Sequence, residues 1–406
     1  MITTKSIKPF ITIHSLTLSF CCLSLIGCSY LSLFQRSDEE QTFAGELQRV
    51  LLRPQNVRQD LLDELLGERP LPVCEGTKCS FVYKGEAGHT VSVAGDWNGW
   101  NAGADLLDPV EGTDYYLLTK EFPPDARLDY KFVVDDKRLL DPQNPKTCER
   151  EDGPNCVLAM PAYLEPEEQK PRPDIRHGII EEMAFESEIL NGTRAVSIYL
   201  PPSYGRASGP HPFLIVQDGG NFIRLARFPD VADVLIEEKK VRRVVIVFVE
   251  PENREEDFLR SEAYLRFTVE ELIPYLRIHY DIGKSREDCG VLGASLGAVA
   301  AFRLAWRYPE LIGKMAGLST CFERDESLTK MVRPLSSKPM QFYLDVGMFE
   351  THTPVSRLDR NRKMRSLLLA ARHELTYSEH NEGHSWGNWR AHLDDVLMAF
   401  WRREPV

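Results

Sequence analysis

The strongest constraint on the fold of this 406-residue chain is an alternation of short apolar runs and helical patterns from about residue 177 onward. Such alternation is typical of a largely parallel sheet that is covered by helices on both faces. The predicted strands are residues 195–200, 213–217, 244–249, 289–294, 315–319, 341–346 and 375–379. The helical patterns between them lie at about residues 230–239, 262–280, 296–308, 360–372 and 388–402. The sequence therefore predicts an α/β domain.

The segment GASLG at residues 293–297 joins a central predicted strand to a helix. In this setting G-x-S-x-G is a nucleophile elbow, a sharp turn that lifts the hydroxyl of Ser295 above the sheet. The two glycines are required because side chains there would clash with the neighbouring strand and helix. We expect the N–H of Leu296, at the helix N-terminus, to stabilise a developing oxyanion. A second donor is expected from Gly219 or Gly220, which follow another predicted strand.

A serine nucleophile needs a histidine base that is oriented by a carboxylate. In α/β-hydrolases the order along the chain is serine, acid, histidine. His384 lies in a glycine-flanked loop between the last predicted strand and the last helix, where the base belongs. Two acids are available near the penultimate strand: Glu350, which lies beyond the strand and is favoured, and Asp345, which lies within it. A histidine that works without a carboxylate is the remaining alternative.

Residues 177–402 resemble the esterase D and enterochelin-esterase group of α/β-hydrolases, which includes feruloyl esterases. The matching stretches are residues 194–204, 218–220, 253–254, 270–274, the elbow at 293–297 and residues 383–390. The resemblance implies hydrolysis of carboxylic esters through an acyl-enzyme, without a metal or another cofactor. It also implies that Arg254, Trp386 and Trp389 lie near the substrate pocket. For the two tryptophans, packing in the core is the alternative.

Residues 73–164 contain short alternating stretches separated by turn residues, as in an immunoglobulin-like β-sandwich. The predicted strands there are residues 80–83, 90–94, 115–118 and 129–134. The fold class predicted for the whole chain is therefore α/β, with an α/β-hydrolase catalytic domain preceded by a β-sandwich domain.

The β-sandwich segment resembles the early-set domains of glycogen-branching enzymes and the glycogen-binding domains of AMP-activated kinases. The matching stretches are residues 93–100, 130–135 and 141–142. The resemblance implies that Trp100 and Lys131 occupy glucan-binding positions. The second tryptophan of that family is replaced here by basic residues near position 137. We therefore expect a structural domain that shapes the esterase pocket, with glucan binding as the alternative.

The first 28 residues predict export with a lipid anchor. A positively charged start is followed by an apolar stretch at residues 10–26, and the sequence LIGC that ends at Cys28 is similar to a bacterial lipoprotein box. A plain membrane anchor is the alternative, although the apolar stretch is short for a spanning helix. We expect lipid on Cys28 and a position at a bacterial membrane, with the outer membrane, facing the periplasm or the cell surface, favoured.

The predicted organisation has five parts. They are a lipoprotein signal peptide at residues 1–27, a tether at 28–72, the β-sandwich at 73–164, a linker at 165–176 and the α/β-hydrolase domain at 177–406.

Charge and cysteines restrict the partners further. The net charge of −12 argues against nucleic acid. In an oxidising compartment, the pair Cys74 and Cys79 and the pair Cys148 and Cys156 could form local disulfides or could cross-pair. The oligomeric state stays open.

The function favoured by these observations is serine-dependent hydrolysis of a small-molecule carboxylic ester outside the cytoplasm. Siderophore, phenolic and carbohydrate esters are the candidate substrates. One alternative is acyl transfer to a sugar, and another is a non-catalytic carbohydrate-binding lipoprotein. The serine, acid and histidine in the correct chain order argue against the non-catalytic alternative.

Overall fold

The computed structural model of the protein describes residues 42–403 except residues 68, 206–209, 333–337 and 353–354. The predicted signal peptide and Cys28 lie outside the described residues. The chain divides into one unit that ends at Leu65 and a second that begins at Leu66. The first unit contains α2 (Phe43–Leu51) and most of α3 (Gln55–Leu66), which lie in the predicted tether.

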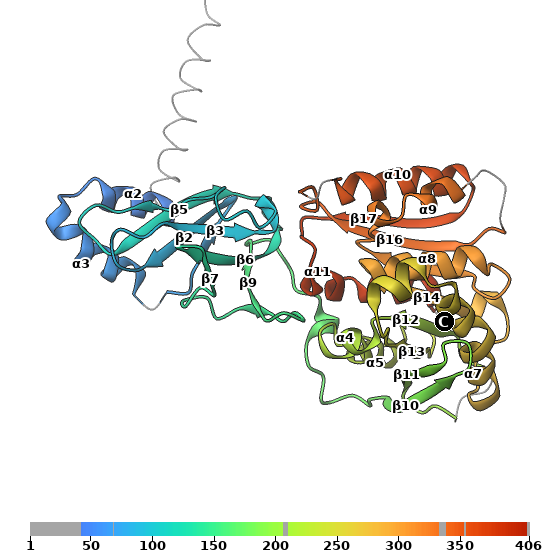
Figure 1. Ribbon diagram of the computed structural model, residues 1–406. Coiled ribbons are helices and arrows are strands. Elements are labelled where there is room, and N and C mark those ends of the chain that lie inside the picture. Colours follow the sequence, from blue (N-terminus) through green and yellow to red (C-terminus); the bar gives the residue numbers. More distant parts are fainter. Residues whose placement is uncertain (1–41, 68, 206–209, 333–337, 353–354, 404–406) are drawn as a thin grey trace, which may run out of the picture. The chain divides into compact units, whose positions relative to one another are not determined.

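An eight-stranded sheet forms the centre of the α/β domain (Figure 1). Its spatial order is β10-β11-β13-β12-β14-β15-β16-β17, with antiparallel pairing between the first three strands and parallel pairing between the others. The strands are β10 (Ile179–Ser187), β11 (Gly192–Leu200), β12 (Phe213–Gln217), β13 (Val245–Val249), β14 (Cys289–Ala294), β15 (Lys314–Leu318), β16 (Gln341–Gly347) and β17 (Glu374–His380). All seven strands predicted in this region are present. The additional strand, β10, is an edge strand with mostly exposed residues, so it lacks the apolar run that marks the others.

Helices cover both faces of this sheet (Figure 1). They are α4 (Gly219–Arg224), α5 (Phe228–Glu237), α6 (Glu262–Arg266), α7 (Ile273–His279), α8 (Leu296–Arg307), α9 (Ser327–Met331), α10 (Arg357–Ala370), α11 (Trp386–Ala391) and α12 (Leu393–Trp401). One apolar core lies between the sheet and α6, α7, α8 and α10, and a second lies between the sheet and α4, α5, α11 and α12. Alternate residues of each central strand enter opposite cores, as expected for a sheet that is buried on both faces.

Two predicted helices are interrupted. The pattern at residues 262–280 forms α6 and α7 with a π-helical turn (Phe267–Leu272) between them. Pro274, near the start of α7, has no N–H to continue the α-helical hydrogen bonds, which accounts for the change of winding. The pattern at residues 388–402 is divided at His392, which separates α11 from α12. Among the described residues, no helix combines the length and the apolar character that a membrane span requires.

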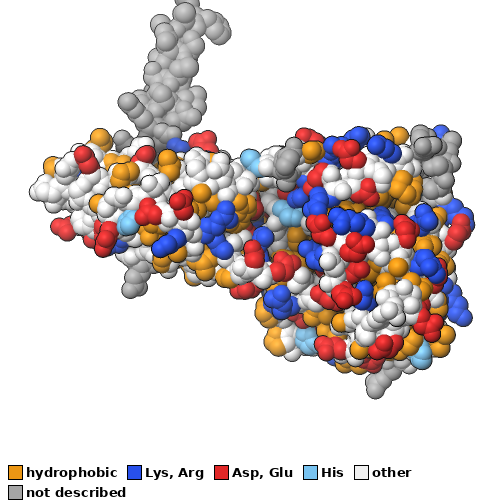
Figure 2. Space-filling model, viewed as in Figure 1, with side chains coloured by type: hydrophobic (Ala, Val, Ile, Leu, Met, Phe, Trp, Pro, Cys, Tyr) orange, Lys and Arg blue, Asp and Glu red, His pale blue; other side chains and the backbone are white. Residues whose placement is uncertain are grey.

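The surface of the α/β domain carries both signs of charge. Figure 2 shows acidic and basic side chains interspersed over the visible face. On the surface of this domain, ion pairs such as Arg362 with Glu379 and Arg360 with Glu326 join neighbouring elements. Exposed pairs of this kind contribute little to stability one by one.

Residues 73–164, called the two-sheet domain below, form two antiparallel sheets. The strands are β1 (Val73–Glu75), β2 (Lys78–Lys84), β3 (Val91–Gly95), β4 (Asp108–Pro109), β5 (Tyr115–Glu121), β6 (Arg127–Val134), β7 (Lys137–Leu139), β8 (Thr147–Cys148) and β9 (Asn155–Ala159). One sheet has the order β1-β2-β5-β4 and the other β3-β6-β9-β8, with β7 added to β6. Phe81 of the first sheet packs edge-on against Tyr130 of the second, with ring centroids 5.3 Å apart, within a shared aromatic core. The early-set, immunoglobulin-like classification of this domain stays a prediction.

The cysteines of the two-sheet domain form one of the two local disulfides considered from the sequence. Cys74 is bonded to Cys79. Cys148 and Cys156 are buried and free, which corrects the expectation of a second local bridge. Cys148 is paired across the strands with Asn155, the neighbour of Cys156, so the two thiols point to opposite faces of the sheet. They accordingly belong to different apolar cores.

Candidate active site

Ser295 occupies the turn between β14 and α8. Its backbone has φ 55° and ψ −119°, a conformation that is costly for a residue with a side chain. A Cβ added to Gly293 would lie 2.1 Å from the carbonyl carbon of Gly297, and one added to Gly297 would lie 2.8 Å from Oδ2 of Asp218. The clashes predicted for the two glycines are therefore present. This turn places the serine at the carboxyl end of a central strand.

The structure brings together the serine, the histidine and the favoured acid. His384 Nε2 lies 3.0 Å from Ser295 Oγ, and His384 Nδ1 lies 2.7 Å from Oε2 of Glu350. Glu350 follows β16 and His384 follows β17, so all three side chains come from loops at the same edge of the sheet. With its proton on Nδ1, the imidazole donates to the carboxylate and leaves Nε2 free to accept the serine proton.

Neighbouring charges and burial set the charge states of Glu350 and His384. Although burial raises it, His384 and Arg357 together bring the pKa of Glu350 down to about 2. Desolvation, followed by the charge of Arg357, lowers the pKa of His384 below its ordinary value. The carboxylate is therefore ionised, and the imidazole is neutral, over the pH range in which a base is needed.

Asp345, the alternative acid, lies elsewhere. It is fully buried within β16, where it accepts hydrogen bonds from the hydroxyl of Tyr343 and the backbone N–H of Ser319, both at 3.3 Å. Burial raises its pKa to about 7. The contacts of the two carboxylates thus distinguish them: it is Glu350 that meets His384.

Glu350 is held by groups that the sequence did not reveal. Its Oε1 accepts a hydrogen bond from Ser319 Oγ at 2.5 Å and from the N–H of Gly347 at 2.9 Å. Ser319 Oγ in turn accepts the indole N–H of Trp389 at 3.0 Å. These donors fix the carboxylate in place and stabilise its charged form.

Arg357, the first residue of α10, is a second unforeseen member of the site. Its Nη1 lies 3.0 Å from Oε2 of Glu350 and 2.7 Å from Nδ1 of His384, while its Nε and Nη2 donate to Oε1 of Glu323. Arg357 and His384 thus both contact Oε2 of Glu350. Only the spatial arrangement reveals it, because an arginine at a helix start carries no sequence signal of its own.

A buried thiol lies beside Ser295. The Sγ of Cys321 is 3.1 Å from Ser295 Oγ. Burial raises the pKa of this thiol to about 11, so it is neutral at ordinary pH and does not compete with the serine as a thiolate.

The predicted oxyanion donors lie around the elbow. Leu296 is the first residue of α8, and the first amides of a helix have no partner within it. Gly219 begins α4, and a Cβ there would lie 2.6 Å from the backbone of Phe248, so only glycine fits. The N–H of Gly220 donates to Glu250 Oε2 at 2.8 Å, so this amide already has an acceptor.

Arg254 lies beside these glycines. Its Nε and Nη2 bind the two oxygens of Asp218 at 2.7 and 2.8 Å. Asp218 is buried, and this burial raises its pKa to about 6, whereas the arginine side chain is 41% exposed. The guanidinium therefore extends from the buried aspartate into solvent.

The two predicted pocket tryptophans are buried. Trp386 is 3% exposed and Trp389 is 6% exposed, and both belong to the second apolar core. The ring of Trp389 meets the imidazole of His384 edge-on, with centroids 4.9 Å apart. Buried indoles offer almost no surface to a substrate, so their position fits support of the histidine loop.

The predicted glucan-binding residues lie in the two-sheet domain. Trp100 donates its indole N–H to Oδ1 of Asp96 at 3.1 Å, and the guanidinium of Arg138 lies 5.7 Å from its ring centroid. Lys131 is on β6, paired with Ala94 of β3. Arg138 is one of the basic residues found where the resembled family has its second tryptophan. Its guanidinium therefore lies over the ring of Trp100.

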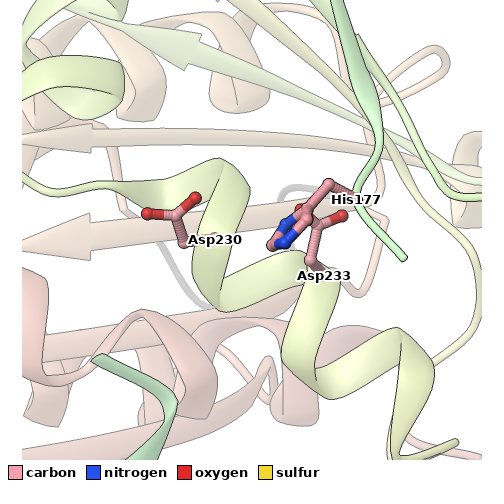
Figure 3. Close-up of side chains that lie close together, drawn as sticks. All are labelled: His177, Asp230 and Asp233. Atoms are coloured by element: carbon pink, nitrogen blue, oxygen red, sulfur yellow. The ribbon is translucent and has the colours of Figure 1, made fainter. Parts of the chain in front are cut away.

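A cluster of His177, Asp230 and Asp233 has the composition of a metal site (Figure 3). Asp233 is already engaged by protein donors, since it accepts from Tyr199 Oη at 2.7 Å, from the N–H of Gly178 at 2.8 Å and from His177. Asp230 is paired with a neighbouring arginine. These contacts account for both carboxylates without an ion.

Sequence comparisons place the chain among esterases. Residues 187–400, more than half of the chain, match the Esterase family model, described as "Putative esterase". The uncharacterized protein YjcH of Bacillus subtilis is 26% identical over 238 residues, which are 55% of this chain and 97% of that protein. An endo-1,4-beta-xylanase/feruloyl esterase of Xylanibacter ruminicola is 22% identical over 245 residues, which are 57% of this chain and 32% of that protein.

Solved structures share the fold. The ferric enterobactin esterase of Salmonella typhimurium has a TM-score of 0.68 at 15% identity, over 82% of this chain and 95% of that one. An enterochelin esterase of Shigella flexneri has a TM-score of 0.66 at 17% identity, over 82% of this chain and 94% of that one. Both coverages exceed the length of the α/β domain alone.

Proposed function

The chain belongs to the Esterase family and is a carboxylic ester hydrolase, and we propose that it acts through a Ser295–His384–Glu350 triad and an acyl-enzyme. The observation that carries this proposal is the continuous hydrogen-bond path from Ser295 Oγ through His384 to Glu350. Each of its two links is within the distance needed for proton transfer or orientation.

In acylation, Ser295 Oγ attacks the carbonyl carbon of the ester while its proton moves to His384 Nε2. The carbonyl oxygen becomes an oxyanion, which the N–H groups of Leu296 and Gly219 stabilise. We favour Gly219 over Gly220 because the amide of Gly220 is occupied by Glu250. Collapse of the intermediate breaks the bond to the alcohol oxygen, which takes the proton from His384 and leaves as the free alcohol.

In deacylation, a water molecule replaces the alcohol. It gives one proton to His384 Nε2 as its oxygen attacks the acyl carbon, and collapse returns that proton to Ser295 Oγ. The products are the free serine and a carboxylic acid. Glu350 stays ionised throughout and stabilises the imidazolium that forms in each half-reaction.

The substrate class follows from chemistry and from similarity. We propose siderophore, phenolic or carbohydrate esters, since structures of the same fold are described as an enterochelin esterase and a ferric enterobactin esterase, and a sequence relative as an endo-1,4-beta-xylanase/feruloyl esterase. Arg254, exposed beside the elbow, is the candidate to bind a polar or anionic part of such a substrate. Initial rates on acetyl, feruloyl and catechoyl esters would rank the three classes, and acylated sugar among the products would reveal acyl transfer instead of hydrolysis.

The triad is tested by replacing its nucleophile. Ser295→Ala should lower kcat on 4-nitrophenyl acetate by about 10⁴-fold or more, since removal of a triad member leaves only binding and the oxyanion hole. Ser366→Ala, an exposed hydroxyl on α10, is the matched control and should keep the wild-type rate. Hydrolysis by Ser295→Ala within tenfold of wild type would overturn the proposed mechanism.

We also propose that the protein acts outside the cytoplasm, attached to a bacterial membrane through lipid on Cys28. The support is the sequence of the first 28 residues, with a positive start, an apolar stretch and the LIGC ending. Radiolabelled palmitate should enter the wild-type protein in a bacterial host and be absent from Cys28→Ala. Equal labelling of both would contradict the anchor.

A further inference from the structure

The loop that carries the candidate base contacts the two-sheet domain on both sides of His384 along the chain. Upstream of His384, the carbonyl of Asn381 accepts the backbone N–H of Arg127 at 3.0 Å, and Arg127 forms an isolated parallel bridge with Glu382. The side-chain amide of Asn381 also donates to Oδ1 of Asp125 at 2.8 Å. The first residues of β6 thus lie along the chain that leads into the histidine.

Downstream of the histidine, the side chain of Arg127 makes the contact with the loop. Its Nη1 donates to Ser385 Oγ at 3.2 Å and to Oδ1 of Asp129 at 2.8 Å. The arginine is 3% exposed and Asp129 is fully buried. Ser385 is also the N-cap of α11, since its side chain accepts the N–H of Asn388. Arg127 therefore reaches the residue next to His384 and the start of the helix behind it.

Two glycines of the loop fit closely against these side chains. A Cβ added to Gly387 would lie 2.1 Å from the guanidinium carbon of Arg127, and one added to Gly383 would lie 2.1 Å from the carboxyl carbon of Asp96. Both neighbours belong to the two-sheet domain. The loop thus approaches that domain more closely than any residue with a side chain would allow.

The residues of the two-sheet domain that contact the loop are themselves held by hydrogen bonds within that domain. Oδ2 of Asp96 accepts the N–H of Asp129 at 2.8 Å, and Oδ2 of Asp129 accepts the amide of Asn155 at 3.2 Å. Cys148 of β8 also packs in the same apolar core as Trp386, the second residue after His384. A network of buried, mutually satisfied groups is rigid enough to position what it contacts.

We propose that Arg127 and Asp96 are positioning residues, which hold the His384 loop in catalytic geometry and make the two-sheet domain a working part of the esterase site. The proposal rests on the triad proposed above. Its physical basis is the steep dependence of rate on alignment, because a displacement of about 1 Å far from the reacting atoms can cost about 100-fold. Arg127 does not itself reach Ser295 and acts only through the loop.

The first test separates positioning from stability. Arg127→Gln should lower kcat on 4-nitrophenyl acetate by about 10- to 100-fold, with KM within about threefold. Asn144→Ala is the matched control, because Asn144 is buried in the two-sheet domain and binds Tyr130 and Val157 there. This control should lower the melting temperature while leaving kcat within about twofold of wild type, as expected for a purely structural hydrogen bond.

The second test approaches the same contact from the loop. Gly387→Ala places a methyl group against Arg127 and should lower kcat by about tenfold in the otherwise wild-type chain. In an Arg127→Ala background, where the space is free, the same change should have almost no further effect. Such non-additivity measures direct coupling between the two positions.

The outcomes separate this inference from the triad. If Ser295→Ala abolishes hydrolysis but folded Arg127→Gln and Gly387→Ala both keep the wild-type kcat, the positioning role is wrong and the triad stands. If Arg127→Gln and Asn144→Ala lose kcat in parallel with melting temperature, the domain contributes only stability and the inference also fails. If Arg127 variants do not fold, the kcat of Gly387→Ala alone decides.

Discussion

The Ser295 region of the α/β domain and the Trp100 region of the two-sheet domain use polar and aromatic side chains in different ways. Around Ser295, hydrogen bonds run from Trp389 through Ser319, Glu350 and His384 and end at the serine oxygen. Around Trp100, the indole N–H is bound by Asp96 and the ring is covered by Arg138. In the first region the chain of hydrogen bonds ends at the hydroxyl of Ser295, the proposed nucleophile, whereas in the second the indole is held by its two neighbours. This difference separates the proposed site of reaction from a region whose contacts only support other residues.

The largest expected effect concerns the histidine of the Ser295 region. His384→Ala removes the base and should lower kcat by about 10⁴-fold or more. The matched control is His279→Ala, which should keep the wild-type rate. His279 is exposed, and its ring lies tilted beside that of Tyr275, with centroids 4.2 Å apart. A mild loss in His384→Ala, measured as steady-state hydrolysis of 4-nitrophenyl acetate, would remove the histidine from the mechanism.

The next effect distinguishes the two acids. Glu350→Gln should lower kcat by about 10²- to 10⁴-fold, because the neutral amide no longer favours the required tautomer or the imidazolium. Asp345→Asn should keep kcat within about tenfold, since this residue contacts Tyr343 and Ser319 and is not hydrogen-bonded to His384. The opposite ranking would transfer the acid role to Asp345, and two small effects would indicate a histidine that needs no carboxylate.

A smaller effect concerns pH. The base works when neutral, so kcat/KM rises as pH increases through the pKa of His384, which lies below the ordinary histidine value. The charged groups around the imidazole are Glu350, Arg357 and Glu323. Arg357→Gln removes the positive charge, which favours the imidazolium, so the acid limb should move to higher pH.

Arg357→Gln should also lose about tenfold in rate at its optimum, because it removes a charge-assisted hydrogen bond to Glu350. Arg360→Gln, one turn further along α10, removes an exposed ion pair with Glu326 and serves as the control. An acid limb of Arg357→Gln that coincides with that of Arg360→Gln would show that the guanidinium does not act on the base.

The smallest expected effect concerns Trp100 and tests whether its region is a supporting one. Trp100→Ala should change the esterase rate by about threefold or less, because it removes one partly exposed hydrogen bond to Asp96. Affinity electrophoresis through glycogen should retard neither the full-length wild type nor the variant. Retardation of the wild type that disappears in Trp100→Ala would make the two-sheet domain a glucan-binding module.

Local patterns in the sequence were sufficient to predict the central sheet and the elbow, and to select the three residues that the structure brings together. Each of these is marked by neighbours in the chain: apolar runs, a G-x-S-x-G turn, and residues that follow successive strands. The edge strand β10 escaped prediction because it buries little. The helix at residues 262–280 is interrupted by a π-helical turn that ends just before Pro274, and periodicity does not register this change.

The supporting residues of the site could not be predicted in this way. Ser319 and Arg357 meet Glu350 only after their separate strands and helices pack together. Arg127 and Ser385 are 258 positions apart and belong to different domains. Such contacts depend on tertiary packing, so the sequence around each residue holds no trace of its partner.

The most direct test of the account is to locate the activated serine chemically. A fluorophosphonate reacts with a serine hydroxyl only when a neighbouring base activates it, and the adduct is stable enough for peptide mapping by mass spectrometry. We expect one adduct per chain, on Ser295, with no labelling of Ser295→Ala and greatly slowed labelling of His384→Ala. An adduct on another residue, or equal labelling of wild type and Ser295→Ala, would contradict the proposed triad.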